Sequence, residues 1–160
     1  MTDLTTHAHA LLDRTLDDIP LTRAMQIRLR DYDGASLTLA APLAPNVNDK
    51  GCAFGGSLAS LATLAGWGLV ALWVEQAGQD CEIYVQNSAI SYLAPLWGEL
   101  SARAELAEGE SRDAFLAALA ARGRARVTVI CRMPDEHGAD ACTLEARFVA
   151  IVKKNAAAAN

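Results

Sequence analysis

Apolar and polar residues alternate along most of this chain, and one long apolar stretch interrupts the alternation. An alternating pattern is typical of strands that bury one face. It occurs in residues 24–41, 82–93, 100–106, 124–133 and 142–152. The apolar stretch carries no charged residue between Lys50 and Glu75, and it is too long for a single strand. We therefore expect a buried helix that begins near Phe54 or Ser57 and ends near Gln76, on the order of 30 Å long.

The strand segments carry local signals of their own. Asp33-Gly34 divides residues 24–41 into two halves, and this dipeptide predicts a hairpin with a two-residue turn. In residues 82–93 the apolar phase shifts from odd to even positions around Asn87-Ser88. Such a shift predicts a bulge or a polar patch that faces a site.

Two further helices are expected. Residues 4–18 carry one apolar stripe, with Thr5 or Thr6 as a cap and Pro20 as a stop. A short helix from Ser111 to Arg122 is bounded by a serine cap and a glycine exit.

An antiparallel sheet that curls around the long helix satisfies both patterns, because the helix needs cover and the strands need an apolar partner. The expected fold class is therefore α+β, with a curved antiparallel sheet wrapped around a central helix. We expect one domain over residues 1–160, with an N-terminal helix in 1–20 and a flexible tail at 154–160.

The amino-acid composition narrows the kinds of binding partner and the cellular compartment that we expect. The 160 residues are 52% hydrophobic and 21% charged, with a net charge of -5. This balance is typical of a soluble globular protein and argues against nucleic acid as a partner. The four cysteines are scattered without a C-x-x-C pair, and no secretory signal pattern precedes them. We expect reduced cysteines in a cytoplasmic protein.

The apolar stretch is also long enough to span a bilayer. Against that interpretation, it contains glycines and hydroxyl residues, and Trp67 lies at its centre instead of its ends. The alternating strands would also still need cover for their apolar face. We therefore expect no membrane contact.

The start of the long helix is the best candidate for chemistry. A glycine pair, Gly55-Gly56, lets the backbone approach a ligand, and the amides at a helix N-terminus can polarise a carbonyl or hold an anion. No metal site is expected. His7 and His9 lie two residues apart, which on a helix points them to different faces, and His137 lies in a turn region.

These residues resemble those of the hotdog-fold thioesterases. The matching segments are Asn46-Val47-Asn48, then Gly51 to Ser57, then the helix through Gly66-Trp67, and finally Ser91 to Leu100. The combination looks most like the thioesterase domain that in some proteins is fused behind an acetyltransferase. The resemblance covers roughly residues 20–153.

The resemblance implies a hotdog fold that hydrolyses acyl thioesters of coenzyme A or acyl carrier protein. No cofactor is implied beyond the coenzyme A moiety of the substrate. A homodimer or homotetramer is implied, with the substrate tunnel at a subunit interface. Unpaired edge strands of a small curved sheet point to the same assembly.

Carried over residue by residue, the resemblance implies catalytic roles for the loop and the helix start. Gly55 and Gly56 would supply oxyanion amides, and Asn48 would lie near the thioester. Thr63 occupies the position, two turns into the helix, where relatives commonly carry a carboxylate, and its neutral hydroxyl could only orient a water or a substrate oxygen. Asp49 is the only carboxylate in the motif and is the fallback general base. The substrate-binding candidates are Asn46, Phe54, Ser57, Ser60, Trp67, Asn87, Ser88 and Tyr92.

Each candidate also has a structural interpretation. The glycines could simply allow close packing, the asparagines could close a loop, and the helix hydroxyls could bond their own carbonyls. Trp67 and Tyr92 could belong to the core. Since the helix lacks a carboxylate and many relatives have histidine where Phe54 stands, a non-catalytic module that binds acyl thioesters is the alternative function. Hydratase or dehydratase activity ranks last, because no histidine lies near the central helix in the sequence.

Overall fold

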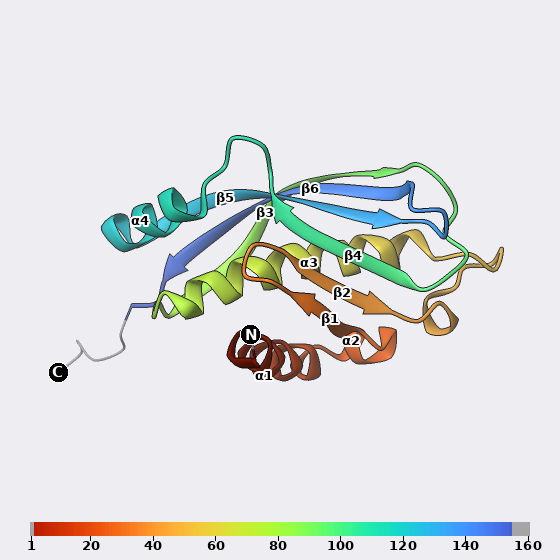
Figure 1. Cartoon of the computed structure of the whole chain (residues 1–160), viewed down its shortest axis with the longest axis horizontal. Coiled ribbons are helices and arrows are strands. Elements are labelled where there is room, and N and C mark those ends of the chain that lie inside the picture. Colours follow the sequence, from red (N-terminus) through yellow and green to blue (C-terminus); the bar gives the residue numbers. More distant parts are fainter. Residues whose placement is uncertain (1, 155–160) are drawn as a thin grey trace.

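The computed structural model describes residues 2–154, and it shows a curved sheet wrapped around one long helix (Figure 1). In chain order the elements are α1 (Thr2–Asp18), α2 (Pro20–Met25), β1 (Arg28–Tyr32), β2 (Leu37–Ala41), the 3-10 helix η1 (Ala44–Asn46), α3 (Gly55–Gln76), β3 (Cys81–Tyr92), β4 (Leu100–Leu106), α4 (Arg112–Arg122), β5 (Arg124–Pro134) and β6 (Asp140–Val152). The predicted α+β hotdog architecture is confirmed. The predicted tail at 154–160 falls almost wholly outside the described residues.

The six strands form one antiparallel sheet in the order β1-β2-β4-β5-β6-β3. In β5, alternate residues from Ala125 to Met133 are buried, as the alternating sequence predicts. The strands β1 and β3 form the two edges of the sheet. The shorter edge, β1, packs against α1, whereas β3 leaves most of its side chains exposed.

The central helix α3 is the core of the fold (Figure 1). It is long and apolar enough to cross a membrane, yet most of it is buried against the sheet, so it is the core helix of a globular protein. Two glycines let it approach the sheet closely. A Cβ at Gly66 would lie 2.8 Å from the Phe148 ring, and one at Gly68 would lie 2.8 Å from Leu37.

Several local predictions are confirmed. The register between β3 and β6 slips between Val85 and Asn87, which places a bulge beside the predicted phase shift. Ser111 caps α4 by accepting a hydrogen bond from the Ala114 amide at 3.2 Å. Gly78, with φ of 70°, follows the end of α3 as predicted.

Two details near the N-terminus differ from the prediction. The strand expected from residue 24 begins only at Arg28, because residues 20–25 form the short helix α2. Proline is favoured at the first position of a helix, because its missing N–H has no helical partner there. The expected Thr5 or Thr6 cap is also wrong, because α1 already begins at Thr2.

Candidate active site at the start of the central helix

The loop before α3 is held by Asn46. This side chain is 1% exposed, and its NH₂ group donates to the carbonyl of Met25 at 2.9 Å and to that of Pro42 at 2.8 Å. Its backbone carbonyl accepts from the Phe54 amide at 2.8 Å. Asn46 therefore joins α2, the end of β2 and the start of α3. Its buried Oδ1 has no partner among the described residues.

Asn48 closes the tip of the same loop. Its Oδ1 accepts from the Lys50 amide at 2.8 Å and from the Cys52 amide at 3.2 Å. The neighbouring Asp49 side chain is 80% exposed and pairs with the Lys50 ammonium at 2.9 Å. The predicted fallback base is therefore a solvated carboxylate in the loop that precedes α3.

The first turn of α3 carries backbone donors that the protein leaves unpaired. The N-cap residue Phe54 is extended and makes no side-chain cap, and the first helical bond runs from the Leu58 amide to the Phe54 carbonyl at 3.0 Å. Within the described chain, the three amides from residue 55 to residue 57 have no acceptor. Because the helix dipole also places partial positive charge here, this end of α3 is suited to a carbonyl oxygen or an oxyanion.

Two aromatic rings flank the glycines. A Cβ at Gly56 would collide with the Phe54 ring, and one at Gly55 would lie 3.4 Å from the Tyr92 ring. The Tyr92 hydroxyl donates to the Gly55 carbonyl at 3.3 Å. Phe54 and Tyr92 are each about half exposed. Glycine at both positions therefore leaves space for rings that stand over the helix start.

A cavity of about 320 Å³ opens beside Gly55 and falls in the size range of small-molecule sites. Its walls are mostly apolar, with the Tyr92 hydroxyl at one side. The lining residues are Cys52, Ala53, Gly55, Leu58, Tyr92, Leu93, Ala94, Pro95 and Leu96. This set contains no carboxylate and no imidazole, so any general base must reach the cavity from its rim or from another chain.

The structure brings only part of the predicted site together. Gly55 and Tyr92 meet at this cavity, with the loop of Asn48 and Asp49 next to it in the chain. Thr63 and Ser60 instead line a second cavity of about 350 Å³ beside Ile19 and Leu21. Thr63 therefore faces a different cavity from Gly55.

The remaining candidates have structural partners or lie at the sheet edge. The Ser60 hydroxyl donates to the Gly56 carbonyl at 2.8 Å, and the Trp67 indole donates to the Ile83 carbonyl at 3.2 Å. Ser57 is 8% exposed. Asn87 and Ser88 are exposed on β3, next to the bulge.

Sequence reasoning did not single out the loop Leu93–Leu96 as part of the site. It follows Tyr92, and Ala53 is tied to it by an amide that donates to the Leu96 carbonyl at 2.8 Å. The segment was visible as part of the resemblance, since Ser91 to Leu100 is one of its matching stretches. The sequence alone could not show that these apolar side chains wall the cavity beside Gly55.

Solved structures share this fold along nearly the whole chain. A protein of unknown function from Chlorobaculum tepidum is 27% identical, with 91% of this chain and 94% of that chain covered and a TM-score of 0.85. A protein from Shewanella oneidensis described as a "putative thioesterase" is 26% identical, with 94% of this chain and 99% of that chain covered and a TM-score of 0.78. A Pseudomonas aeruginosa protein described as a "probable thioesterase" shares the fold at 21% identity, with 93% of this chain and 96% of that chain covered and a TM-score of 0.77.

The family comparison agrees with the fold. Residues 8–152 match the family described as "Putative thioesterase (yiiD_Cterm)", which is most of the chain. The protein belongs to this thioesterase family, within the hotdog-fold superfamily.

Proposed function

We propose that the protein hydrolyses acyl thioesters of coenzyme A or acyl carrier protein. The observation that carries the proposal is the set of unpaired amides at Gly55 and Gly56, beside an apolar cavity. An acyl thioester needs both features, because its carbonyl must be polarised and its chain must leave water. The reaction uses no cofactor other than the coenzyme A moiety of the substrate itself.

In the proposed mechanism the thioester oxygen accepts from the Gly55 and Gly56 amides, and the acyl chain lies along Leu58 and Leu96. Asp49 turns from Lys50 and takes a proton from water, whose oxygen attacks the carbonyl carbon. The resulting oxyanion is stabilised by the same amides, which act most strongly where negative charge develops. Collapse breaks the C–S bond, and Asp49 returns its proton to the departing sulfur, so that the products are the free thiol and the carboxylic acid. Asn48 keeps the loop of Asp49 in place through its bonds to Lys50 and Cys52.

The test is release of free coenzyme A from a panel of acyl-CoAs, and of the free-thiol carrier from acyl carrier proteins, each followed by chromatography so that the protein's own thiols do not interfere. We expect Asp49→Asn to lower kcat by about 100-fold, the typical contribution of a general base. Asp31→Asn, which changes an exposed carboxylate on β1, should leave kcat unchanged. Absence of turnover across the whole panel would contradict the proposal.

A non-catalytic acyl-thioester binding module is the second candidate. It is favoured by the cavity walls, which carry no carboxylate or histidine, and by the neutral Thr63 in the helix. In that case acyl-CoA would raise the unfolding temperature while remaining intact. Hydratase chemistry stays the least supported option, since no histidine lines the cavity beside Gly55. His7 lies 3.3 Å from Glu75 at the opposite end of α3, His9 lies on α1, and His137 lies in the β5–β6 turn.

We also propose that the protein assembles as a homodimer through β3, or as a homotetramer built from two such dimers. The support is an unpaired edge of twelve residues with large apolar side chains exposed on it, including Tyr84, Val85 and Tyr92. Because Tyr92 belongs to both β3 and the cavity wall, a second copy on this edge would lie next to the site. The cytoplasm remains the proposed location, with the four free cysteines as its support.

A further inference from the structure

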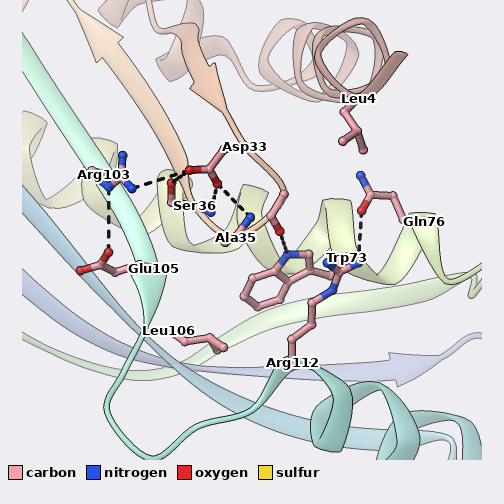
Figure 2. A pocket seen from close by; sticks show the side chains of 11 residues that line it. Leu4, Asp33, Ala35, Ser36, Trp73, Gln76, Arg103, Glu105, Leu106 and Arg112 are labelled. Carbon is pink, nitrogen blue, oxygen red and sulfur yellow. Dashed lines mark hydrogen bonds and ion pairs between the residues drawn. The ribbon is translucent and has the colours of Figure 1, made fainter. Parts of the chain in front are cut away.

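A second candidate site is a cavity at the opposite end of α3, about 30 Å from Gly55 by the rise of the helix. Its volume is about 690 Å³, and it lies between the β1–β2 loop, β4, the start of α4 and the N-terminal part of α1 (Figure 2). Apolar walls come from Leu4, Trp73 and Leu106, and charged side chains come from β4 and α4. The size suits a small molecule.

The two arginines of this cavity differ in their ion-pair partners (Figure 2). Arg103 lies between two carboxylates, 3.7 Å from Asp33 and 3.9 Å from Glu105. Arg112 has no carboxylate within 4 Å among the described residues, and its guanidinium stands 5.7 Å from the centre of the Trp73 ring. Among the side chains that the structure describes, Arg112 is therefore a cation at the cavity wall without a counter-ion.

Around Arg112 there are fewer hydrogen-bond acceptors than donors. The Gln76 carbonyl oxygen accepts two long bonds, from Arg112 Nη2 at 3.4 Å and from the Tyr32 hydroxyl at 3.2 Å. Arg112 Nε and Gln76 Nε2 are buried without an acceptor in the described chain. An unsatisfied buried donor costs about 1–3 kcal/mol, and more when it is charged. Both atoms are shut off from the cavity in this structure, so a bound anion would reach them only after one of the two side chains rotates.

We propose that this cavity binds a small carboxylate with an apolar chain or ring. The guanidinium fork of Arg112 matches the two carboxylate oxygens, and the apolar walls cover the rest of the ligand. A monoanion fits better than a phosphate dianion, because Asp33 and Glu105 carry two negative charges against the one positive charge of Arg103, which leaves only the charge of Arg112 for a ligand. The site is independent of the proposed thioesterase reaction and lies at the other end of the central helix.

The experiment titrates octanoate, below its micelle concentration, into protein with ¹⁵N-labelled tryptophan. The three indole signals report on different places: Trp73 on this cavity, Trp67 on β3, and Trp97 on the loop near Gly51. Trp67→Phe and Trp97→Phe assign the signals. We expect octanoate to shift the Trp73 signal saturably with a Kd below about 1 mM, and the uncharged octanamide to bind at least tenfold more weakly.

Arg112→Gln should weaken octanoate binding at least tenfold, and Arg112→Lys should weaken it less. Arg122→Gln, at the other end of α4, is the matched control and should bind as the wild type does. The proposal is overturned if Trp67 or Trp97 shifts instead of Trp73, if octanamide binds equally well, or if no signal shifts up to about 10 mM octanoate. Should Arg112→Gln fail to fold, Arg112→Lys and the octanamide comparison decide the question. Octanoate bound as a reaction product beside Gly55 would be insensitive to Arg112, so failure here leaves the thioesterase proposal standing.

Discussion

At the scale of single residues, Asp33 shows how one side chain reshapes a turn. The sequence predicts a two-residue hairpin loop at Asp33-Gly34, but the last strand pair is Tyr32 with Leu37, so the loop has four residues. The Asp33 carboxylate accepts from the Ala35 amide at 2.9 Å and from the Ser36 amide at 2.6 Å. An aspartate that bonds amides two and three residues ahead stabilises this wider turn.

These bonds predict a specific acid response. Burial raises the pKa of Asp33, but the hydrogen bonds from Ser36 and Ala35 and the charge of Arg103 outweigh it, so the pKa is lowered overall. A lowered folded-state pKa gives stability that is complete above the unfolded pKa and is lost as pH falls through the folded pKa. Urea unfolding between about pH 2 and 6 should therefore show a shallower acid loss for Asp33→Asn than for the wild type or Asp31→Asn. Equal slopes for all three proteins would refute this.

Thiol reactivity is predicted at the same scale. Burial raises the pKa of Cys131 to about 12 and that of Cys142 to about 11, and the Cys131 thiol donates to the Ala62 carbonyl at 3.1 Å. The thiolate is the reactive form. In native protein at neutral pH we expect iodoacetamide to leave both unmodified, with the half-buried Cys81 labelled first, as measured by peptide mass spectrometry. Labelling of Cys131 before unfolding would contradict the structure.

At the scale of elements, long periodic segments were predictable and short ones were not. The bounds of α3 follow from an uncharged run between two polar ends, and Gly78 marks its end. The six-residue helix α2 is too short to show a helical period, and Met25 and Ile27 mimic a strand. The helix ends because Gln26 takes a left-handed conformation with φ of 57°, which its residue type does not reveal.

The close approach of α3 to the sheet predicts a cost for any side chain at Gly66. A Cβ there would lie 2.8 Å from the fully buried Phe148, so Gly66→Ala must displace that ring. Overpacking costs about 1–3 kcal/mol, and the better helix propensity of alanine returns about 1 kcal/mol. We expect a net loss of about 1 kcal/mol in the free energy of unfolding, measured with urea. Gly98→Ala is the control, since no atom lies within 4 Å of its Cβ position, and a stability gain at Gly66 would show that the contact is wrong.

The sequence predicts those features of the candidate site that depend on neighbouring residues, but not the contacts between distant segments. Gly55 and Gly56 were found because they begin a helix, which is a local property. The contact of Tyr92 with Gly55 joins residues 37 positions apart, and it depends on how β3 lies against the helix. Thr63 is a candidate because it lies two turns into the helix, and counting turns fixes only its position along the helix axis. It faces the cavity beside Ile19 and Leu21, at the start of α2, and α2 was not predicted.

At the scale of the whole molecule, the exposed edge β3 predicts self-association. Val85 is 46% exposed on an edge strand, and a lysine there would place a charge in the proposed interface. Light scattering should show a dimer or tetramer for the wild type and at least tenfold weaker association for Val85→Lys. Asp31→Lys, on the opposite edge, should assemble normally. A wild-type protein that is monomeric at all concentrations would exclude the proposed assembly.

The two edge strands of the sheet differ in length and in charge, and this difference limits how many copies can add to the sheet. The β1 edge is only five residues long, lies against α1, and carries Arg28 and Arg30, both bound to Glu99. Short and charged edges resist pairing with further strands. If two copies join through β3 about a two-fold axis, the long edge is consumed and only the resistant edge is left. Strand addition then terminates after one step, so the protein can use an open sheet edge for assembly without seeding fibrils.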